Sequence, residues 1–164
     1  MNILKVGDKT KIGAAILSII IALGVGGLSG FLSMDNMKDY EGFAKPVFSP
    51  PGWVFPIVWT ILYILMGLAA YRVWEQGKQG QDVKKALVLY ALQLFLNFLW
   101  PIIFFEFRLY GLAFVELLVL LIFILLTTFE FFRIDRTAGY LMLPYIVWVS
   151  FAGILNFAIW SLNS

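Results

Sequence analysis

The sequence of 164 residues contains no cysteine and no histidine. Without cysteine the chain has no disulfide framework and no thiol nucleophile. Without histidine it lacks the commonest general base and metal ligand, and a haem held by an axial imidazole is excluded. These absences argue against metal-dependent and acid–base enzymes.

Charged residues are also scarce, at 13% of the chain, whereas hydrophobic residues make up 62% and aromatic residues 18%. A soluble domain is close to half apolar and a quarter charged. The core of a 164-residue domain cannot bury this excess of hydrophobic residues, so lipid must solvate much of the surface. The net charge of +2 is too small to indicate nucleic-acid binding.

Five continuous apolar stretches are long enough to cross a bilayer, which needs about 20 helical residues for each span. Their unbroken apolar character favours helices over the alternating strands of a membrane barrel. We therefore predict an all-α integral membrane protein, a single domain over 1–164. It is a five-transmembrane-helix bundle with helices at about 12–33, 53–74, 84–105, 109–132 and 139–162.

The first apolar stretch follows a basic flank, as a signal peptide does. However, its length of about 22 residues exceeds a typical signal core of roughly 7–15, and no small-residue cleavage site follows it. We interpret it as a retained membrane helix. Along it small residues recur at every fourth position, which predicts a close helix–helix contact within or between protomers; they are Ala14, Ser18, Ala22, Gly26 and Gly30.

The distribution of lysine and arginine predicts the orientation in the membrane. Nine of the twelve lie in the N-terminal segment and in the second and fourth loops with their flanks. The positive-inside rule then places the N-terminus in the cytoplasm and the C-terminus outside. The remaining three are Lys38, Lys45 and Arg108, in the first and third loops.

The long first loop, 34–52, lies on the outer side in this topology. Its double proline, Pro50-Pro51, favours an extended backbone before the second helix. Phe43, Val47 and Phe48 are apolar and argue against disorder. We predict an ordered lid.

Three of the helices carry aromatic or amide side chains spaced three or four residues apart, hence on one face of each helix. Counting about 1.5 Å per residue from the outer helix ends places four of them, Trp59, Asn97, Trp100 and Asn156, in one layer roughly 8–12 Å deep, and Trp148 about 20 Å deep. A pocket of this kind suits a flat, apolar small molecule. The predicted walls contain Phe55, Trp59, Tyr63, Asn97, Trp100, Trp148, Ala152 and Asn156.

Other interpretations of these residues remain open. Trp59 and Trp148 also fit ordinary core packing, and Asn97 and Asn156 could bond each other or a backbone group across helices. Glu116, a carboxylate inside a predicted span, is a candidate for proton or cation coupling.

Together, these residues resemble the TspO/MBR family, the tryptophan-rich sensory proteins of bacteria and the mitochondrial translocator or peripheral benzodiazepine receptor. The resemblance extends from about Tyr40 to Asn163. It rests on Tyr40, Lys45-Pro46, Pro50-Pro51, Trp59, Asn97, Trp100, Leu143-Pro144-Tyr145, Trp148, Phe151-Ala152 and Leu155-Asn156.

The resemblance implies a homodimeric protein, here of a bacterial cell membrane, that needs no cofactor. Its ligand would be protoporphyrin IX, haem or a related tetrapyrrole, and in some members sterol-like or benzodiazepine-type molecules. The ligand lies beneath the first loop in the family. By motif position the pocket would use Tyr40, Phe55, Trp59, Asn97, Trp100, Trp148, Ala152 and Leu155.

Two alternative functions accompany this expectation. Some members of the family degrade protoporphyrin in light and oxygen, and the implicated tryptophans match Trp59 and Trp148. A small tetrapyrrole or lipid transporter is the other, although internal repeats are absent and five helices cannot form two equal halves.

The sequence departs from the family at Phe48, where tryptophan is usual, and at Pro101, where serine often follows the tryptophan. Pro101 is expected to free a carbonyl and kink its helix. No lysine or arginine follows Arg136, so the family's C-terminal sterol-recognition pattern is missing.

Overall fold

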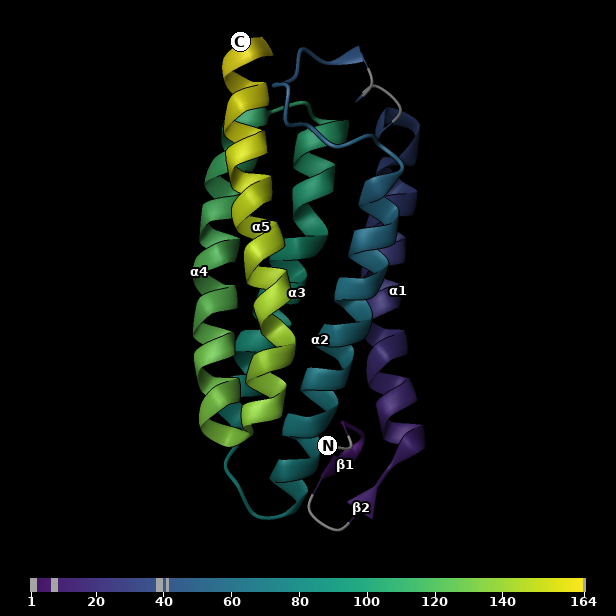
Figure 1. The fold of residues 1–164 in the computed structure, drawn as a ribbon, viewed down its shortest axis with the longest axis vertical. Coiled ribbons are helices and arrows are strands. Elements are labelled where there is room, and N and C mark those ends of the chain that lie inside the picture. Colours follow the sequence, from purple (N-terminus) through teal and green to yellow (C-terminus); the bar gives the residue numbers. More distant parts are fainter. Residues whose placement is uncertain (1–2, 7–8, 38–39, 41, 164) are drawn as a thin grey trace.

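A computed structural model describes residues 3–6, 9–37, 40 and 42–163, and positions 38, 39 and 41 of the predicted first loop lie outside them. Five long helices run side by side, and each is long and apolar enough to cross a membrane (Figure 1). The predicted five-helix membrane bundle is confirmed. The elements are β1 (Lys5–Val6), β2 (Lys9–Thr10), α1 (Ile12–Met37), α2 (Val54–Lys78), α3 (Lys84–Pro101), the π-helical segment η2 (Ile102–Glu106), α4 (Tyr110–Ile134) and α5 (Arg136–Asn163).

The bundle has two distinct ends. At the hairpin end lie the short antiparallel hairpin β1–β2 and the connections α2–α3 and α4–α5 (Figure 1). At the loop end lie the first loop, the turn between η2 and α4, and the C-terminus. These groupings match the antiparallel order expected from short connections.

Several predicted helix boundaries differ from the observed ones. The chain coils further than hydropathy indicates: α1 continues to Met37, α2 to Lys78, and α5 begins at Arg136. Polar residues at the membrane surface extend a helix without adding to its hydropathy, so spans predicted from apolar length are shorter than the helices. The sequence also gave no prediction of the hairpin before α1.

At Pro101 the regular α-helix ends and η2 begins. Proline has no N–H to donate, which removes one bond of the α-helical ladder. The chain continues with wider turns, in which the Phe107 N–H donates to the Ile102 carbonyl at 3.1 Å. The expected disturbance of the helix therefore takes the form of a change in helix type.

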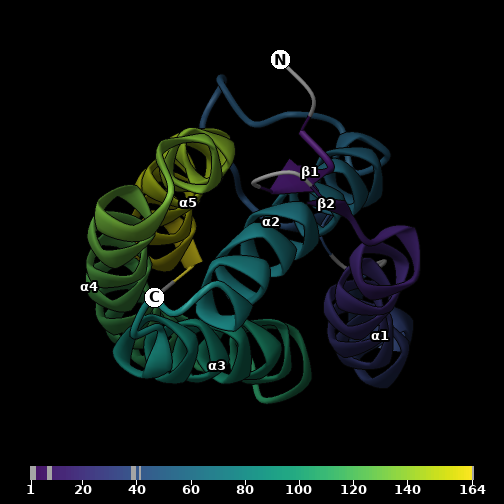
Figure 2. The same cartoon turned by 90° about the horizontal axis from the view of Figure 1, so that it is seen from below.

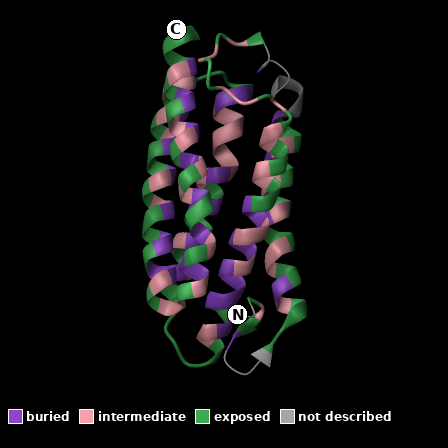
Figure 3. Cartoon of the chain, in the orientation of Figure 1, coloured by how far each residue is buried: buried purple, intermediate pink, exposed green. Residues whose placement is uncertain are grey.

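Burial separates an interior from a lipid-facing surface. Buried residues concentrate on the inward faces of α2 to α5, while α1 stands at the edge of the bundle (Figures 2 and 3). The outward face of α1 is apolar and exposed, as Ile16, Leu17 and Phe31 illustrate. In a bilayer this surface packs against acyl chains, which explains the composition.

The small residues of α1 make their close contact within the protomer. The Ser18 hydroxyl donates to the Gly67 carbonyl on α2 at 2.6 Å. A Cβ at Gly67 would lie 2.6 Å from the Cα of Ile19, so only glycine permits this approach of the two backbones. Ala22 is fully buried at the same interface.

A buried arginine fastens the hairpin end. The Arg72 side chain on α2 forms an ion pair with Asp135, which directly precedes α5. It also donates to the carbonyls of Ile3 and Lys5. Its guanidinium thus bonds two separate segments at once and joins both to α2. The neighbouring Tyr71 hydroxyl adds hydrogen bonds to Leu4 and Lys11.

Replacement of Arg72 by methionine should therefore destabilise the fold strongly. It leaves Asp135, whose side chain is 10% exposed, without this partner, and breaking a buried pair in this way costs about 3–5 kcal/mol. Unfolding in mixed detergent micelles measures the loss. Arg136→Met, at an exposed site, is the control, and equal stability of the two variants would contradict the assignment.

Candidate functional site

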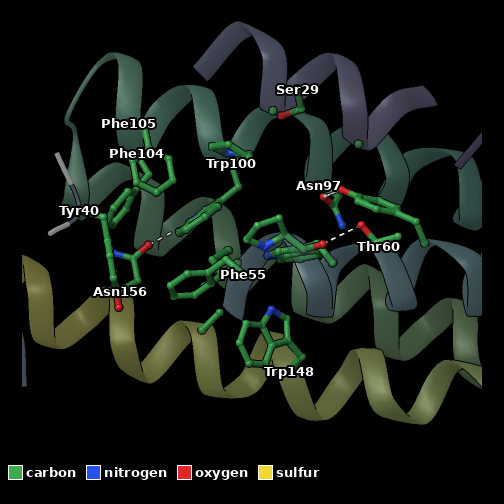
Figure 4. A pocket seen from close by; sticks show the side chains of 18 of the residues that line it. Ser29, Tyr40, Phe55, Thr60, Asn97, Trp100, Phe104, Phe105, Trp148 and Asn156 are labelled. Atoms are coloured by element: carbon green, nitrogen blue, oxygen red, sulfur yellow. Dashed lines mark hydrogen bonds between the residues drawn. The ribbon is translucent and has the colours of Figure 1, made fainter. Parts of the chain in front are cut away.

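A cavity of about 420 Å³ lies inside the bundle toward the loop end, with walls from all five α-helices and the first loop (Figure 4). The structure brings every predicted site residue to this one cavity. They are Tyr40, Phe55, Trp59, Tyr63, Asn97, Trp100, Trp148, Ala152, Leu155 and Asn156.

A chain of hydrogen bonds crosses the bundle on the hairpin side of the cavity. The Tyr63 hydroxyl donates to Asn97 Oδ1 at 2.6 Å, and Asn97 Nδ2 donates to the Tyr145 hydroxyl at 2.6 Å. Tyr145 in turn donates to Gln93 Oε1 at 2.7 Å. All four side chains are buried. The chain joins α2, α3 and α5, and both Oδ1 and Nδ2 of Asn97 have a partner in it.

A second amide ties the helices together near the loop end. Asn156 Oδ1 accepts from the indole nitrogen of Trp100 at 2.9 Å, and Asn156 Nδ2 donates to the Tyr110 carbonyl at 3.0 Å. This arrangement joins α5 to α3 and α4. The two asparagines do not bond each other, but Asn156 bonds a backbone group across helices, as one interpretation expected, and both asparagines also line the cavity.

Aromatic rings form most of the remaining wall. Phe55 lies edge-on between Tyr40, at 5.0 Å between ring centroids, and Trp148, at 5.7 Å. Trp59 lies 5.7 Å from Tyr63. Trp148 therefore lies beside the first turn of α2. The depth of about 20 Å, counted from the outer end of its own helix, had predicted a position well below that turn. The difference arises because α5 rises past the start of α2 at the loop end (Figure 1).

The described part of the first loop packs over the cavity. The Tyr40 hydroxyl donates to the Pro50 carbonyl at 2.9 Å, and Lys45 Nζ donates to the Tyr40 carbonyl at 2.8 Å. Phe43 packs 5.6 Å from the ring of Tyr110. Phe48 packs against Phe151 at 6.2 Å, although half of its surface is exposed. These contacts give the loop the form of a lid.

The cavity offers aromatic faces and few polar groups. Among the described residues that line it, none carries a charge. Within that described part, the buried Nε1 of Trp148 has no hydrogen-bond partner, so it is a donor available to a ligand (Figure 4). Glu116 is not part of the lining, and its neighbour Leu117 is. The site suits an apolar molecule with a hydrogen-bond acceptor.

Sequence reasoning missed fourteen of the described lining residues, among them five of α1 and two of η2. The α1 glycines were expected only to pack against a helix, although their lack of side chains also leaves room for a cavity. Phe104 and Phe105 were missed because the wider turns of η2 change the helical period. The additional lining residues are Leu23, Gly26, Gly27, Ser29, Gly30, Gly52, Pro56, Thr60, Pro101, Phe104, Phe105, Leu117, Leu120 and Ile159.

Comparison with known proteins finds the same family along most of the chain. The model of the TspO/MBR family matches residues 17–161. The Tryptophan-rich protein TspO of Chlorobaculum tepidum is 40% identical over 92% of this chain and 94% of its own length. The Tryptophan-rich protein TspO of Archaeoglobus fulgidus is 37% identical over the full length of both. The human Translocator protein is 38% identical over 82% of this chain and 80% of its own length.

The hydrogen-bonded chain can be tested with two tyrosine variants. Tyr145→Phe removes the hydroxyl that serves both Asn97 and Gln93, so it should lower the free energy of unfolding by about 1–2 kcal/mol. Tyr90→Phe is the matched control, because Tyr90 is also buried but its hydroxyl has no partner among the described residues. Unfolding in mixed micelles compares them; an equal loss would contradict the role of Tyr145.

Proposed function

Because the chain belongs to the TspO/MBR family, we propose that it is a membrane-embedded binding protein for porphyrins such as protoporphyrin IX and similar flat apolar ligands. It acts through binding rather than turnover. The observation that carries the proposal is the aromatic cavity beneath the first loop, which joins residues of all five α-helices. The names of the relatives, sensory protein and translocator, agree with a ligand-responsive role.

The size and surface of the cavity support a large planar guest. Its volume of about 420 Å³ falls in the range of small-molecule sites. Phe55, Trp59 and Trp148 present rings from α2 and α5, and Trp100 presents one from α3. Aromatic faces stack favourably on flat conjugated molecules. We infer that the ligand lies with its plane between Trp59 and Trp148.

Polar groups orient this ligand. The Trp148 N–H would donate to an acceptor on the ligand, since an unpaired buried donor costs free energy. The described lining residues offer carboxylates no cationic partner, so the propionates of protoporphyrin would point to the loop end. There Lys45 lies 4.2 Å above the ring of Tyr40. Because burying a charge costs free energy, the neutral ring of the ligand would lie inside the cavity and its charged groups at the membrane surface.

The orientation in the membrane is part of the proposal. Nine of the twelve lysines and arginines belong to segments at the hairpin end, and Lys45 and Arg108 belong to the loop end, while Lys38 is outside the described residues. We infer that the hairpin end faces the cytoplasm of a bacterial cell and that the lid faces outward.

Light-driven breakdown of the bound porphyrin is the second candidate, because Trp59 and Trp148 both line the cavity. An excited porphyrin in contact with indole could exchange an electron with it, with oxygen as the final oxidant. In this case the same residues would act in catalysis as well as in binding.

Titration of the purified protein with protoporphyrin IX tests binding. Tryptophan fluorescence should be quenched with saturation at a fixed stoichiometry. Trp59→Phe combined with Trp148→Phe should weaken affinity at least tenfold, about 1.4 kcal/mol, because two aromatic walls and one donor are altered. Trp74→Phe, remote from the cavity, is the control. Unchanged affinity and quenching in the double variant would overturn the site.

Illumination of the complex tests the second candidate. If the indoles take part, bound porphyrin should bleach faster than porphyrin in detergent alone, and the double variant should lose the excess rate. Absorbance of the porphyrin band follows the reaction. Equal rates in all samples that bind porphyrin would leave binding as the sole function of the site.

A further inference from the structure

The cavity is closed on three sides and open on one. Its lining residues from α3, α4 and α5 are buried or partly buried. The exposed ones are Gly27 on α1 and Pro56 and Thr60 on α2. An opening must therefore lie between α1 and α2, in the wall opposite α5. Figure 4 shows Ser29 of α1 and Trp148 of α5 on opposite sides of the cavity.

The packing of α1 explains this opening. Toward the hairpin end α1 is held against α2, where Ser18 bonds Gly67. The last such close contact is at Gly26, where an added Cβ would overlap the ring of Tyr63. Three residues later the Ser29 hydroxyl donates to the Phe98 carbonyl on α3 at 2.7 Å. At this level α1 is anchored to α3, and a Cβ added at Gly27 or Gly30, the described α1 glycines beyond Gly26, would touch no atom of α2.

The sequence leaves the opening without side chains that could close it. Gly27 and Gly30 are both lining residues, and a Cβ at either meets no atom within 4 Å. On the α2 side the Thr60 hydroxyl donates to the Pro56 carbonyl at 2.6 Å. The rim therefore presents no unpaired hydroxyl, as contact with lipid requires.

The level of the opening places it in the hydrocarbon layer. Thr60 is six residues from the start of α2, about 9 Å at 1.5 Å per residue. Exposed apolar residues surround it, including Ile57 and Ile61 on α2 and Leu28 on α1. The loop end offers no comparable route in the described residues, because Tyr40 is 5% exposed and is bonded to Pro50 and Lys45.

We propose that the gap bounded by Gly27, Gly30, Pro56 and Thr60 is a lateral portal, through which apolar ligands pass between the cavity and the lipid leaflet around it. The portal rests on the proposed ligand binding and adds the path by which the ligand enters and leaves the cavity. The first loop then covers the ligand without having to open for each exchange. The ligands that this route admits are flat apolar molecules dissolved in the bilayer, whose apolar body passes the rim while any carboxylates stay toward the loop end and the membrane surface.

Exchange kinetics test the portal. Gly27→Phe should narrow it, because the added ring starts in open space at its rim. Gly24→Phe is the matched control: it lies one turn away on α1, is exposed, has equal space for a Cβ and does not line the cavity. The protein in lipid vesicles is mixed with protoporphyrin IX, and tryptophan quenching gives the association rate. Mixing the loaded protein with empty vesicles gives the dissociation rate.

Gly27→Phe should lower both the association and the dissociation rate constants roughly tenfold, while Gly24→Phe should retain the rates of the unmodified chain. Rates that are equal in the two variants would overturn the portal, and so would faster dissociation with unchanged association, which indicates only a lost contact. If Gly27→Phe does not fold, Thr60→Trp obstructs the same gap from α2 and carries the same expectation. A chain that shows no quenching by protoporphyrin at all would instead refute the binding function.

Discussion

The structure depends on the need to satisfy polar groups inside lipid. Tyr63, Asn97, Tyr145 and Gln93 form one buried chain of hydrogen bonds across three helices. Because no water competes for these groups, each bond that is lost leaves an unpaired donor or acceptor. The chain fixes how α2, α3 and α5 face one another, and the space above it remains as the cavity. The same hydrogen bonds therefore stabilise the bundle and shape the cavity.

The lid and the portal result from how the first loop and α1 pack against the hydrogen-bonded helices α2, α3 and α5. The first loop is held by Tyr40 and Lys45 and closes the loop end. Helix α1 joins α2 through small residues at the hairpin side and changes partner at Ser29. This arrangement suits a binding protein for ligands dissolved in the membrane, because the gap between α1 and α2 admits the ligand while the lid excludes water. The described lining residues are all uncharged, which suits such ligands.

Much of this arrangement was predictable from the sequence. Apolar length alone identified five spans, and the helical period placed Trp59 with Tyr63, and Trp148 with Ala152 and Asn156, on shared faces. The tertiary partners were not predictable. The period could not show that Asn97 would bond Tyr145, that Pro101 would start wider turns, or that Arg72 would hold a hairpin. The bonds of Asn97 and Arg72 join segments far apart in the chain, for which local pattern carries no information, and a proline in a helix is compatible with a kink as well as with a change of helix type.

An experimental structure of the protein with protoporphyrin IX bound in a lipid environment tests the central claim most directly. The account predicts density for a flat molecule between Trp59 and Trp148, beneath Tyr40, with an acceptor within hydrogen-bond distance of the Trp148 indole nitrogen. Density for the porphyrin on the lipid-facing surface, with the cavity unaltered, would contradict it.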